Sequence, residues 1–206
     1  MTVIDVKRRT KWYSRRRRRL VAVIGSGHVA DPRCEEVGRL IATLGFDLLT
    51  GGGRGVMQAV SRAFFETPAR RGLVVGVIPG SIERIERLER REPGGVEYTL
   101  RDDYPNEWVE IAIYTHLPDS GSEGTLKSSR NHINVLSADA IVAFPGQEGT
   151  NAEIWLSTQY AVPAIAYGDH RDGAPYGIPL ARSLGELRRF LEKTLEPLEP
   201  LNLSNL

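Results

Sequence analysis

Three glycine-rich segments are the parts of this chain best suited to holding an anion. They are residues 25–27 (Gly-Ser-Gly), residues 51–55 (Gly-Gly-Gly-Arg-Gly) and residues 145–150 (Pro-Gly-Gln-Glu-Gly-Thr). Glycine lets backbone N–H groups approach a phosphate closely, and a helix that follows the loop points its positive end at the same anion. One such loop alone is better explained as a tight turn. Three of them, each after an expected strand, favour a phosphate or nucleotide site.

Arg130 and Glu153 lie on either side of the third loop and carry the charges that nucleotide chemistry needs. Arg130 stands 15 residues before Pro145, and Glu153 stands three after Thr150. A guanidinium can bind phosphate or ribose, or neutralise charge on a leaving group. A carboxylate can stabilise the positive charge that develops on ribose when an N-glycosidic bond breaks. Spacing alone leaves the alternatives open, since Arg130 also fits a surface helix and Glu153 fits a first-turn helix acid.

Three more side chains near these loops have groups that can touch a ligand. Thr150 offers a hydroxyl and an N–H to phosphate, or it is an ordinary helix N-cap. Ser26 contacts the ligand from the first loop, or it caps its own turn. Met57 touches a base, although an apolar residue at helical spacing is more often part of the core.

Other cofactor chemistries are poorly supported by the residues present. The first loop fits the dinucleotide fingerprint only loosely, as Gly25-x-Gly27-x-x-Ala30, and the second expected strand ends without the acid that NAD binding needs. A GxxxxGK[ST] P-loop is absent, and only Lys127 of the four lysines lies near the loops to form a pyridoxal Schiff base. One cysteine and four scattered histidines do not suit a metal site. We expect no metal and no resident cofactor.

The net charge of +1 conceals a basic N-terminal segment. Residues 1–20 hold nine basic residues and one acid, whereas the other 186 residues hold 18 basic and 25 acidic residues. Five consecutive arginines at residues 15–19 suit nucleic acid or an anionic surface, but without interleaved aromatic residues we favour a solvated arm. No apolar run approaches the roughly 18 residues of a membrane span, and no signal peptide is recognisable. We expect a cytoplasmic protein with no membrane or nucleic-acid partner.

The elements that must position these residues alternate between strands and helices. Apolar runs predict strands over residues 20–24, 46–50, 73–78, 108–114, 140–144 and 164–167. Helical spacing predicts helices over residues 32–44, 55–66, 81–92, 125–137, 151–160 and 183–195. This alternation predicts a Rossmann-like α/β fold in three layers: a doubly wound, mostly parallel sheet with helices on both faces. Ligands bind at the carboxyl ends of such strands, where the three glycine loops fall.

A single domain accounts for this pattern. We predict a basic, flexible arm over residues 1–19, one Rossmann-like nucleotide-binding domain over residues 20–195, and an irregular tail over residues 196–206. The polar stretch at residues 92–124 has no assigned role.

Several motifs, in order, resemble those of the lonely-guy (LOG) family of nucleotide phosphoribohydrolases. Residues 50–60 (TGGGRGVMQAV) resemble the family's GGG-x-G-[LV]-M segment, and residues 76–79 (GVIP) resemble its next strand end. Arg130, the Ala-Asp-Ala at residues 138–140 and the Pro-Gly-x-x-Gly-Thr-x-x-Glu pattern at residues 145–153 resemble its signature. The resemblance covers roughly residues 20–168.

The LOG resemblance implies an activity and a set of site residues. The activity is hydrolysis of a nucleoside 5′-monophosphate to a free base and ribose 5-phosphate, without metal, by at least a homodimer. Arg130 and Glu153 are then the catalytic residues. The residues expected to bind the phosphate or nucleotide are Ser26, Gly51, Gly52, Gly53, Gly55, Met57, Asn131, Pro145, Gly146, Gly149 and Thr150.

Three departures from the family pattern keep a second hypothesis open. Gln147 replaces the second glycine of PGG, Asn131 replaces the lysine that usually follows the arginine, and Ala152 replaces the first of two acids. Non-hydrolytic relatives share the fold, among them molybdenum-cofactor carrier proteins. The alternative is therefore a carrier or sensor that binds a phosphate-bearing ligand, such as the molybdenum cofactor or a signalling nucleotide, without cleaving it.

Overall fold

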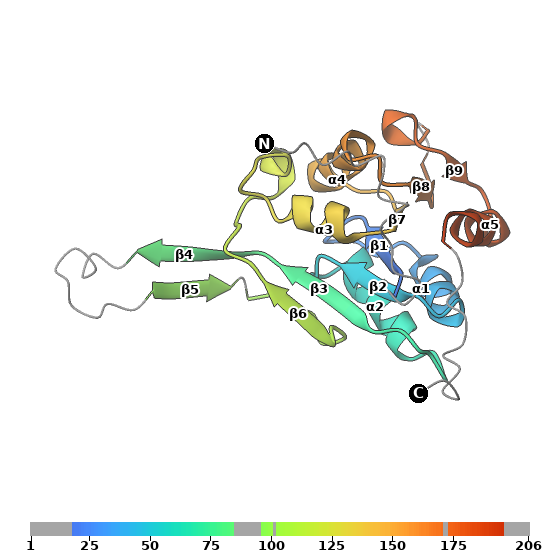
Figure 1. Ribbon diagram of the computed structural model, residues 1–206, viewed down its shortest axis with the longest axis horizontal. Coiled ribbons are helices and arrows are strands. Elements are labelled where there is room, and N and C mark those ends of the chain that lie inside the picture. The colour runs from blue at the N-terminus through green and yellow to red at the C-terminus, as the bar shows by residue number, and fades with distance from the viewer. Residues whose placement is uncertain (1–17, 85–95, 101, 171–172, 196–206) are drawn as a thin grey trace, which may run out of the picture.

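The computed structural model describes residues 18–84, 96–100, 102–170 and 173–195, and Figure 1 shows their arrangement. The strands are β1 Leu20–Ile24, β2 Asp47–Thr50, β3 Val74–Ile78, β4 Gly80–Arg84, β5 Val96–Leu100, β6 Ile111–Tyr114, β7 Ala140–Ala143, β8 Ala164–Tyr167 and β9 Leu180–Ala181. The helices are α1 Cys34–Thr43, α2 Val56–Phe65, α3 Asn131–Ser137, α4 Glu148–Gln159 and α5 Leu184–Thr194, with short 3-10 turns η3 Gly121–Glu123 and η4 Pro175–Gly177.

Seven of these strands form one parallel sheet in the order β6-β3-β2-β1-β7-β8-β9. Val21 of β1 pairs with Leu48 of β2 on one side and with Ala140 of β7 on the other. The chain runs outward from β1 through β2 and β3 to β6, and then returns to β7 on the other side of β1. The strand order therefore reverses between β1 and β7, which makes their carboxyl ends the switch point of the sheet.

The sheet is the middle one of three layers. In β1, Val21 and Val23 belong to the core cluster that includes residues of α1, α2 and α5. Ala22 and Ile24 belong to the second cluster, with residues of α3 and α4. Successive strand residues point to opposite faces, so this alternation shows helices on both faces. The predicted doubly wound α/β fold is confirmed.

Close packing of α1 against α2 helps to set the position of the second glycine loop. A Cβ at Gly38 of α1 would lie 2.6 Å from the carbonyl oxygen of Val60 and 3.0 Å from Cβ of Ala63, both on α2. Only glycine permits this separation, because any side chain would push the helices apart. Since α2 begins directly after residues 51–55, the position of α2 determines where that loop ends.

The helix predicted from residue 81 is wrong for the residues that the structure describes. β4 instead pairs antiparallel with β5, from Gly80 opposite Leu100 to Arg84 opposite Val96. The hydroxyl of Tyr98 donates to the carbonyl of Thr115 at 2.8 Å, which fixes this hairpin to the end of β6. Pairing with a distant strand overrides the local helical preference of a charged segment. Residues 85–92 of the predicted helix lie outside the described residues.

The helix predicted over residues 125–137 is shorter than expected and begins at Asn131. Its first half is a turn, in which the backbone N–H of Asn131 donates to Oγ of Ser129 at 3.2 Å. Nε2 of His132 lies 3.1 Å and 3.0 Å from the carbonyl oxygens of Thr125 and Leu126. Side-chain bonds of this kind compete with helical ones. The helix predicted over residues 151–160 begins three residues earlier than expected, because α4 starts at Glu148.

Two arginines of the basic run are bound to the sheet. Nε of Arg18 lies 2.7 Å from Oδ2 of Asp47, and Nη1 of Arg19 lies 3.8 Å from Oδ1 of Asp139. Asp47 and Asp139 stand at the amino ends of β2 and β7, so both arginines lie at the end of the sheet away from the glycine loops. Residues 1–17 and 196–206 lie outside the described residues. They include most of the predicted arm and the whole of the predicted tail. Within the described residues, no helix has the length and apolarity to cross a bilayer.

Candidate functional site

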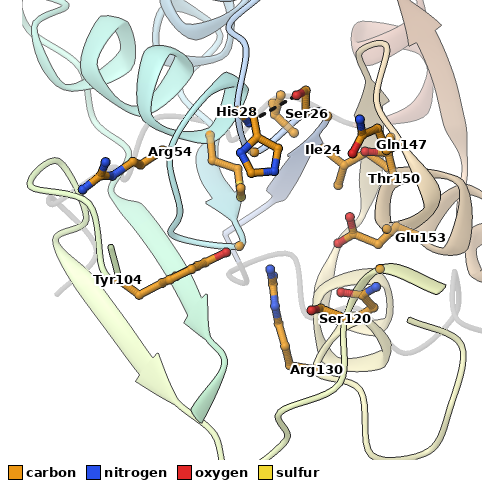
Figure 2. Close-up of a pocket in the computed structure, with 18 of the residues that line it drawn as sticks. Ile24, Ser26, His28, Arg54, Tyr104, Ser120, Arg130, Gln147, Thr150 and Glu153 are labelled. Atoms are coloured by element: carbon orange, nitrogen blue, oxygen red, sulfur yellow. Dashed lines mark hydrogen bonds between the residues drawn. The ribbon is translucent and has the colours of Figure 1, made fainter. Parts of the chain in front are cut away.

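A cleft of about 290 Å³ opens at the carboxyl ends of the central strands (Figure 2). Its walls come from the ends of β1 and β2, from the loop between β7 and α4, and from the start of α3. It therefore lies at the switch point between β1 and β7, where doubly wound sheets bind ligands. Its volume is close to the lower limit of small-molecule sites, about 300 Å³.

The cleft brings together most of the residues that the sequence predicts for the site. Eight of them line it: Ser26, Gly51, Met57, Arg130, Asn131, Gly149, Thr150 and Glu153. Five others are not part of its lining: Gly52, Gly53, Gly55, Pro145 and Gly146. Gly52 and Gly55 have positive φ values of 74° and 62°, so they shape the turn behind the cleft wall.

Arg130 is a buried cation with unused hydrogen-bond donors. It immediately precedes α3, is 6% exposed, and points up into the cleft in Figure 2. Its guanidinium packs on the backbone of Gly51, where a Cβ would lie 2.2 Å from Nη1. Nε and Nη1 of Arg130 have no hydrogen-bond partner among the described residues. Buried donors are normally paired, so these two are free to donate to an acceptor that enters the cleft.

Glu153 faces the same space from α4 (Figure 2). It is 8% exposed, and its Oε1 accepts a 2.9 Å hydrogen bond from Nδ2 of Asn134. Burial raises the pKa of Glu153, although the charge of Arg130 and the bond from Asn134 act in the opposite direction. The carboxyl therefore takes up a proton more readily than an exposed glutamate does.

The amino end of α4 has no side-chain cap and borders the cleft. Gln147, the residue before α4, makes no side-chain capping bond, so N–H groups of the first turn remain available to an anion. The start of α2 is different, because the N–H of Val56 donates to the carbonyl of Ser26 at 2.9 Å. Oγ of Ser26 accepts from the N–H groups of His28 and Val29, which leaves its own proton free to donate. Ser26 and the start of α4 can therefore both donate to an anion in the cleft.

Two departures from the LOG pattern place amide side chains at this cleft. Gln147 has an extended backbone, with φ −102°, so no glycine is required there, and its side chain is exposed on the cleft wall. Asn131 is 3% exposed, and its Nδ2 would lie 2.7 Å from a Cβ at Gly124. Both amides can bond a ligand, but neither carries the charge of a lysine.

Other lining residues were missed by sequence reasoning. They are Val23, Ile24, His28, Asp103, Tyr104, Ser120 and Gly121, whereas Gly25, Gly27 and Arg54 belong to the glycine-rich segments that the sequence predicted without naming them one by one. Val23, Ile24 and His28 lie within two residues of the first predicted loop, so proximity could have identified them. Ser120 and Gly121 belong to a visibly Gly/Ser-rich loop. Tyr104 and Asp103 had no local signal, because they come from the stretch at residues 92–124 and reach the cleft only through the tertiary fold.

The described residues contain no group of three or more His, Cys, Asp or Glu side chains arranged to hold a metal ion. The single cysteine, Cys34, is buried in the core at the start of α1, and burial raises its pKa to about 12. It is therefore a packing residue and is not poised for thiolate chemistry.

Comparison with known proteins places these features in a family. The model of the SLOG cluster4 family matches residues 18–175. An uncharacterized protein of Archaeoglobus fulgidus is 30% identical over 145 residues, which cover 66% of this chain and 72% of that protein.

Two solved structures resemble the chain over most of its length. The molybdenum cofactor binding protein of Rippkaea orientalis is 25% identical, with a TM-score of 0.63, and the match covers 86% of this chain and 98% of that one. The Moco carrier protein of Chlamydomonas reinhardtii is also 25% identical, with a TM-score of 0.60 and the same coverage.

Proposed function

Because the chain belongs to the SLOG cluster4 family, we propose that it is a binding protein for a phosphate-bearing small molecule, in the manner of a molybdenum-cofactor carrier. The observation that carries this proposal is the buried guanidinium of Arg130, whose Nε and Nη1 are unpaired in the cleft. Its charge already acts on Glu153, but buried donors without partners are unfavourable, so an anionic ligand that accepts from Nε and Nη1 would stabilise the site.

The surroundings of Arg130 support a phosphate as that anion. The first turn of α4 offers free N–H groups and its positive end, and Ser26 lies across from it with a donating hydroxyl. Together these donors match the several oxygens of a phosphate better than the two of a carboxylate.

The relatives support a role in binding more directly than one in catalysis. The two solved structures at 25% identity are described as a molybdenum cofactor binding protein and a Moco carrier protein. The substitutions at Gln147, Asn131 and Ala152 also remove groups that LOG enzymes usually have beside their ligand. We therefore give priority to the binding hypothesis over hydrolysis.

Calorimetric titration tests this proposal with AMP, GMP and molybdenum cofactor freshly released from a molybdoenzyme. We expect the wild type to bind at least one of them, and Arg130→Met to weaken that binding by about tenfold or more, as for a charged hydrogen bond. Arg188→Met is the matched control, because Arg188 is an exposed residue of α5 that pairs with Glu192. The proposal is wrong if none of the three ligands binds below about 1 mM, or if both variants bind like the wild type.

Hydrolysis of a nucleoside 5′-monophosphate is the second candidate, and Glu153 is the observation that favours it. Its carboxyl faces the cleft beside Arg130, where an ionised oxygen can stabilise positive charge at C1 of ribose or orient the attacking water. Because the pKa of Glu153 is raised, we expect the rate to increase with pH until this carboxyl is ionised.

A product assay decides between binding and hydrolysis. AMP, GMP, CMP, UMP and an N6-substituted AMP are incubated with wild type and with Glu153→Gln, and free base is measured by chromatography. Base released by the wild type and not by the variant supports hydrolysis. The absence of base from all five nucleotides, at protein concentrations that exhaust substrate for an active LOG enzyme, contradicts it.

The expected homodimer remains a prediction that follows from the LOG resemblance. Light scattering on the purified full chain measures it, and a mass of one chain, 22.9 kDa, at all concentrations would contradict it.

A further inference from the structure

Glu153, Asn134 and Arg130 form a buried polar cluster where α3 meets α4. Each of the three is less than a tenth exposed. Arg130 and Glu153 line the cleft and point into it in Figure 2, whereas Asn134 stands on α3 four residues after Arg130 and is not part of the lining. Because water has little access to this cluster, its hydrogen bonds must be made within it or with a ligand.

The cluster contains one side-chain hydrogen bond and leaves an acceptor unused. Nδ2 of Asn134 donates to Oε1 of Glu153 at 2.9 Å. Oδ1 of the same amide is buried and has no hydrogen-bond partner among the described residues. Nε and Nη1 of Arg130 do not donate to the carboxyl either, since both are unpaired. The carboxyl of Glu153 is therefore held by Asn134, which still has an oxygen to offer.

A proton on Glu153 would complete the hydrogen bonding of this pair. An ionised carboxylate can only accept, so it leaves Oδ1 of Asn134 without a donor. A protonated carboxyl has one O–H group, and a primary amide that faces it can accept from that group while its own N–H donates to the other oxygen. An unsatisfied buried acceptor is unfavourable, so the pair favours the protonated state. Burial acts in the same direction, because it raises the pKa of Glu153.

The charge of Arg130 opposes protonation of Glu153 in the absence of a ligand. It lowers the pKa of the carboxyl, as does the bond from Asn134, although burial has the larger effect. An anion bound at Nε and Nη1 of Arg130 would neutralise the guanidinium and place a negative charge near the carboxyl. Both changes favour a proton on Glu153, so binding of an anion and uptake of a proton are coupled.

Other titratable or charged side chains near Glu153 lie on the cleft walls or on neighbouring surfaces. Those that line the cleft are His28, Arg54, Asp103 and Tyr104, and the first two are exposed. Glu148 of α4 and Glu123 of η3 are also exposed, so water screens their charges. His28, when protonated, would favour an anion with the same pH dependence as Glu153. A test of the coupling must therefore remove Glu153 itself.

We propose that the cleft binds its anionic ligand together with one proton, which Glu153 takes up from solvent and donates to Oδ1 of Asn134. The inference rests on the proposed function and adds a regulation of the same site by pH. Asn134 is a positioning residue, which donates to the carboxyl when it is ionised and both donates and accepts when it is protonated. As pH rises, the proton returns to solvent, the carboxylate repels the anion, and the ligand is released.

The first test is calorimetric titration of the full chain from about pH 5.5 to about pH 8.5. The probe is whichever of AMP, GMP and released molybdenum cofactor binds the wild type most tightly. Glu153→Gln represents the neutral state, and Glu148→Gln is the matched control, because it removes an exposed carboxylate from the same helix. A ligand phosphate itself titrates at about pH 6. The quantity measured is therefore the ratio of wild-type to Glu153→Gln affinity at each pH.

We expect this ratio to be highest at the acidic end and to fall by up to about tenfold per pH unit as Glu153 ionises, since one proton is linked to binding. Glu148→Gln should keep the pH dependence of the wild type. Titrations in two buffers with different ionisation enthalpies count the protons directly. Where the ratio falls, the wild type should take up more protons per ligand than Glu153→Gln, by up to about one.

Infrared difference spectroscopy tests the role of Asn134. Ligand binding to the wild type should produce the carbonyl band of a protonated carboxyl, and this band should be absent from Glu153→Gln. In Asn134→Leu, which cannot accept the hydrogen bond, the band should move to higher frequency. An unshifted band would show that Asn134 is not the acceptor. The melting temperature of Asn134→Leu checks its fold, and the proton count does not depend on this variant.

The outcomes separate this inference from the proposed function. A ratio that does not change with pH, or equal proton uptake by the wild type and Glu153→Gln, overturns the coupling while the phosphate site stands. Loss of the pH dependence in Glu148→Gln also contradicts it, since the proton would then belong to a different carboxylate. If no ligand binds the wild type at any pH, the proposed function itself fails.

Discussion

Because Gly51 has no side chain, the guanidinium of Arg130 can pack against its backbone. The guanidinium occupies the volume that a Cβ at position 51 would need, only 2.2 Å from Nη1. Gly51 was expected from its sequence to offer backbone N–H groups to a phosphate. Its position indicates a second role, which is to give Arg130 a place inside the cleft.

Gly51→Ala should therefore reproduce the loss of Arg130 without removing the charge. The new methyl displaces the guanidinium, and we expect affinity for the best of the three phosphate ligands to fall by about tenfold, as for Arg130→Met. The measurement is calorimetric titration. Gly185→Ala on α5 is the control, because a Cβ there meets nothing closer than 3.9 Å. Unaltered binding by Gly51→Ala would show that the position of the guanidinium is not important.

Glu153 allows a prediction about pH at the same scale. Because its pKa is raised in the folded protein, stability is complete below the unfolded-state pKa and declines as pH rises through the folded-state value. Glu153→Gln removes the buried charge and can still accept the bond from Asn134. We expect this variant to melt at a higher temperature than wild type at pH 7.5, by about 2–4 °C for each kcal/mol, with the difference vanishing toward pH 4. A difference that does not depend on pH would rule out this explanation.

At the scale of elements, the site depends on how closely α1 and α2 approach. Gly38 allows the contact, and α2 carries Met57 into the cleft. The third glycine loop is positioned in a comparable way from the other side, since the N–H of Ser26 donates to the carbonyl of Pro145 at 3.2 Å. The loops therefore have fixed relative positions that no single loop could maintain.

Gly38→Ala should destabilise the fold by about 1–3 kcal/mol, the typical cost of overpacking. The reason is the 2.6 Å approach of the new Cβ to the carbonyl of Val60, which α2 can relieve only by moving away. Urea denaturation of wild type, Gly38→Ala and Gly185→Ala measures this effect. Gly185→Ala adds a helix-favouring residue in open space and should be neutral or slightly stabilising. Equal stability of the two alanine variants would contradict the prediction.

The segment that carries Tyr104 provides a second test at this scale. Asn106→Ala removes the 2.8 Å bond to Gly53 and the bond to Trp108, so the segment should loosen and stability should fall by about 1–3 kcal/mol. Urea denaturation of wild type and Asn106→Ala measures this effect. If the two proteins unfold at the same urea concentration, these bonds do not hold the segment in place.

At the scale of the whole molecule, the basic end and the cleft lie at opposite ends of the sheet. Arg18 and Arg19 contact Asp47 and Asp139 at the amino ends of strands, whereas the cleft is at the carboxyl ends. A strand residue spans about 3.3 Å, so these ends are separated by the length of the central strands, roughly 15 Å. The charges of Arg18 and Arg19 are thus far from the cleft.

Since residue 18 lies at the end of the sheet away from the cleft, we expect removal of residues 1–17 to leave ligand affinity unchanged within about threefold. Titration and melting temperature of the shortened chain, which keeps Arg18 and Arg19, check this. We also expect neither form to bind duplex DNA in a filter assay at physiological salt. A large loss of ligand affinity would show that the arm takes part in the site, and DNA binding by the full chain alone would assign the arm to nucleic acid.

Sequence by itself determined the class of the fold and the edge of the sheet where the site lies. Alternating apolar runs and helical spacings are local signals, so they predicted the parallel sheet. The glycine loops at strand ends predicted the edge of the sheet, and the LOG resemblance placed Arg130 and Glu153 beside the third loop. Local signals failed at residues 81–84, where pairing with β5 outweighs helix propensity.

The tertiary structure alone decided what surrounds the ligand. The unpaired donors of Arg130, the raised pKa of Glu153 and the place of Tyr104 in the cleft lining all arise from residues that are distant along the chain. Burial and charge–charge distance depend on every element packed around a group, so no spacing of residues can express them. Tyr104 lines the cleft, and two residues later Asn106 binds the carbonyls of a glycine turn more than 50 residues earlier in the chain.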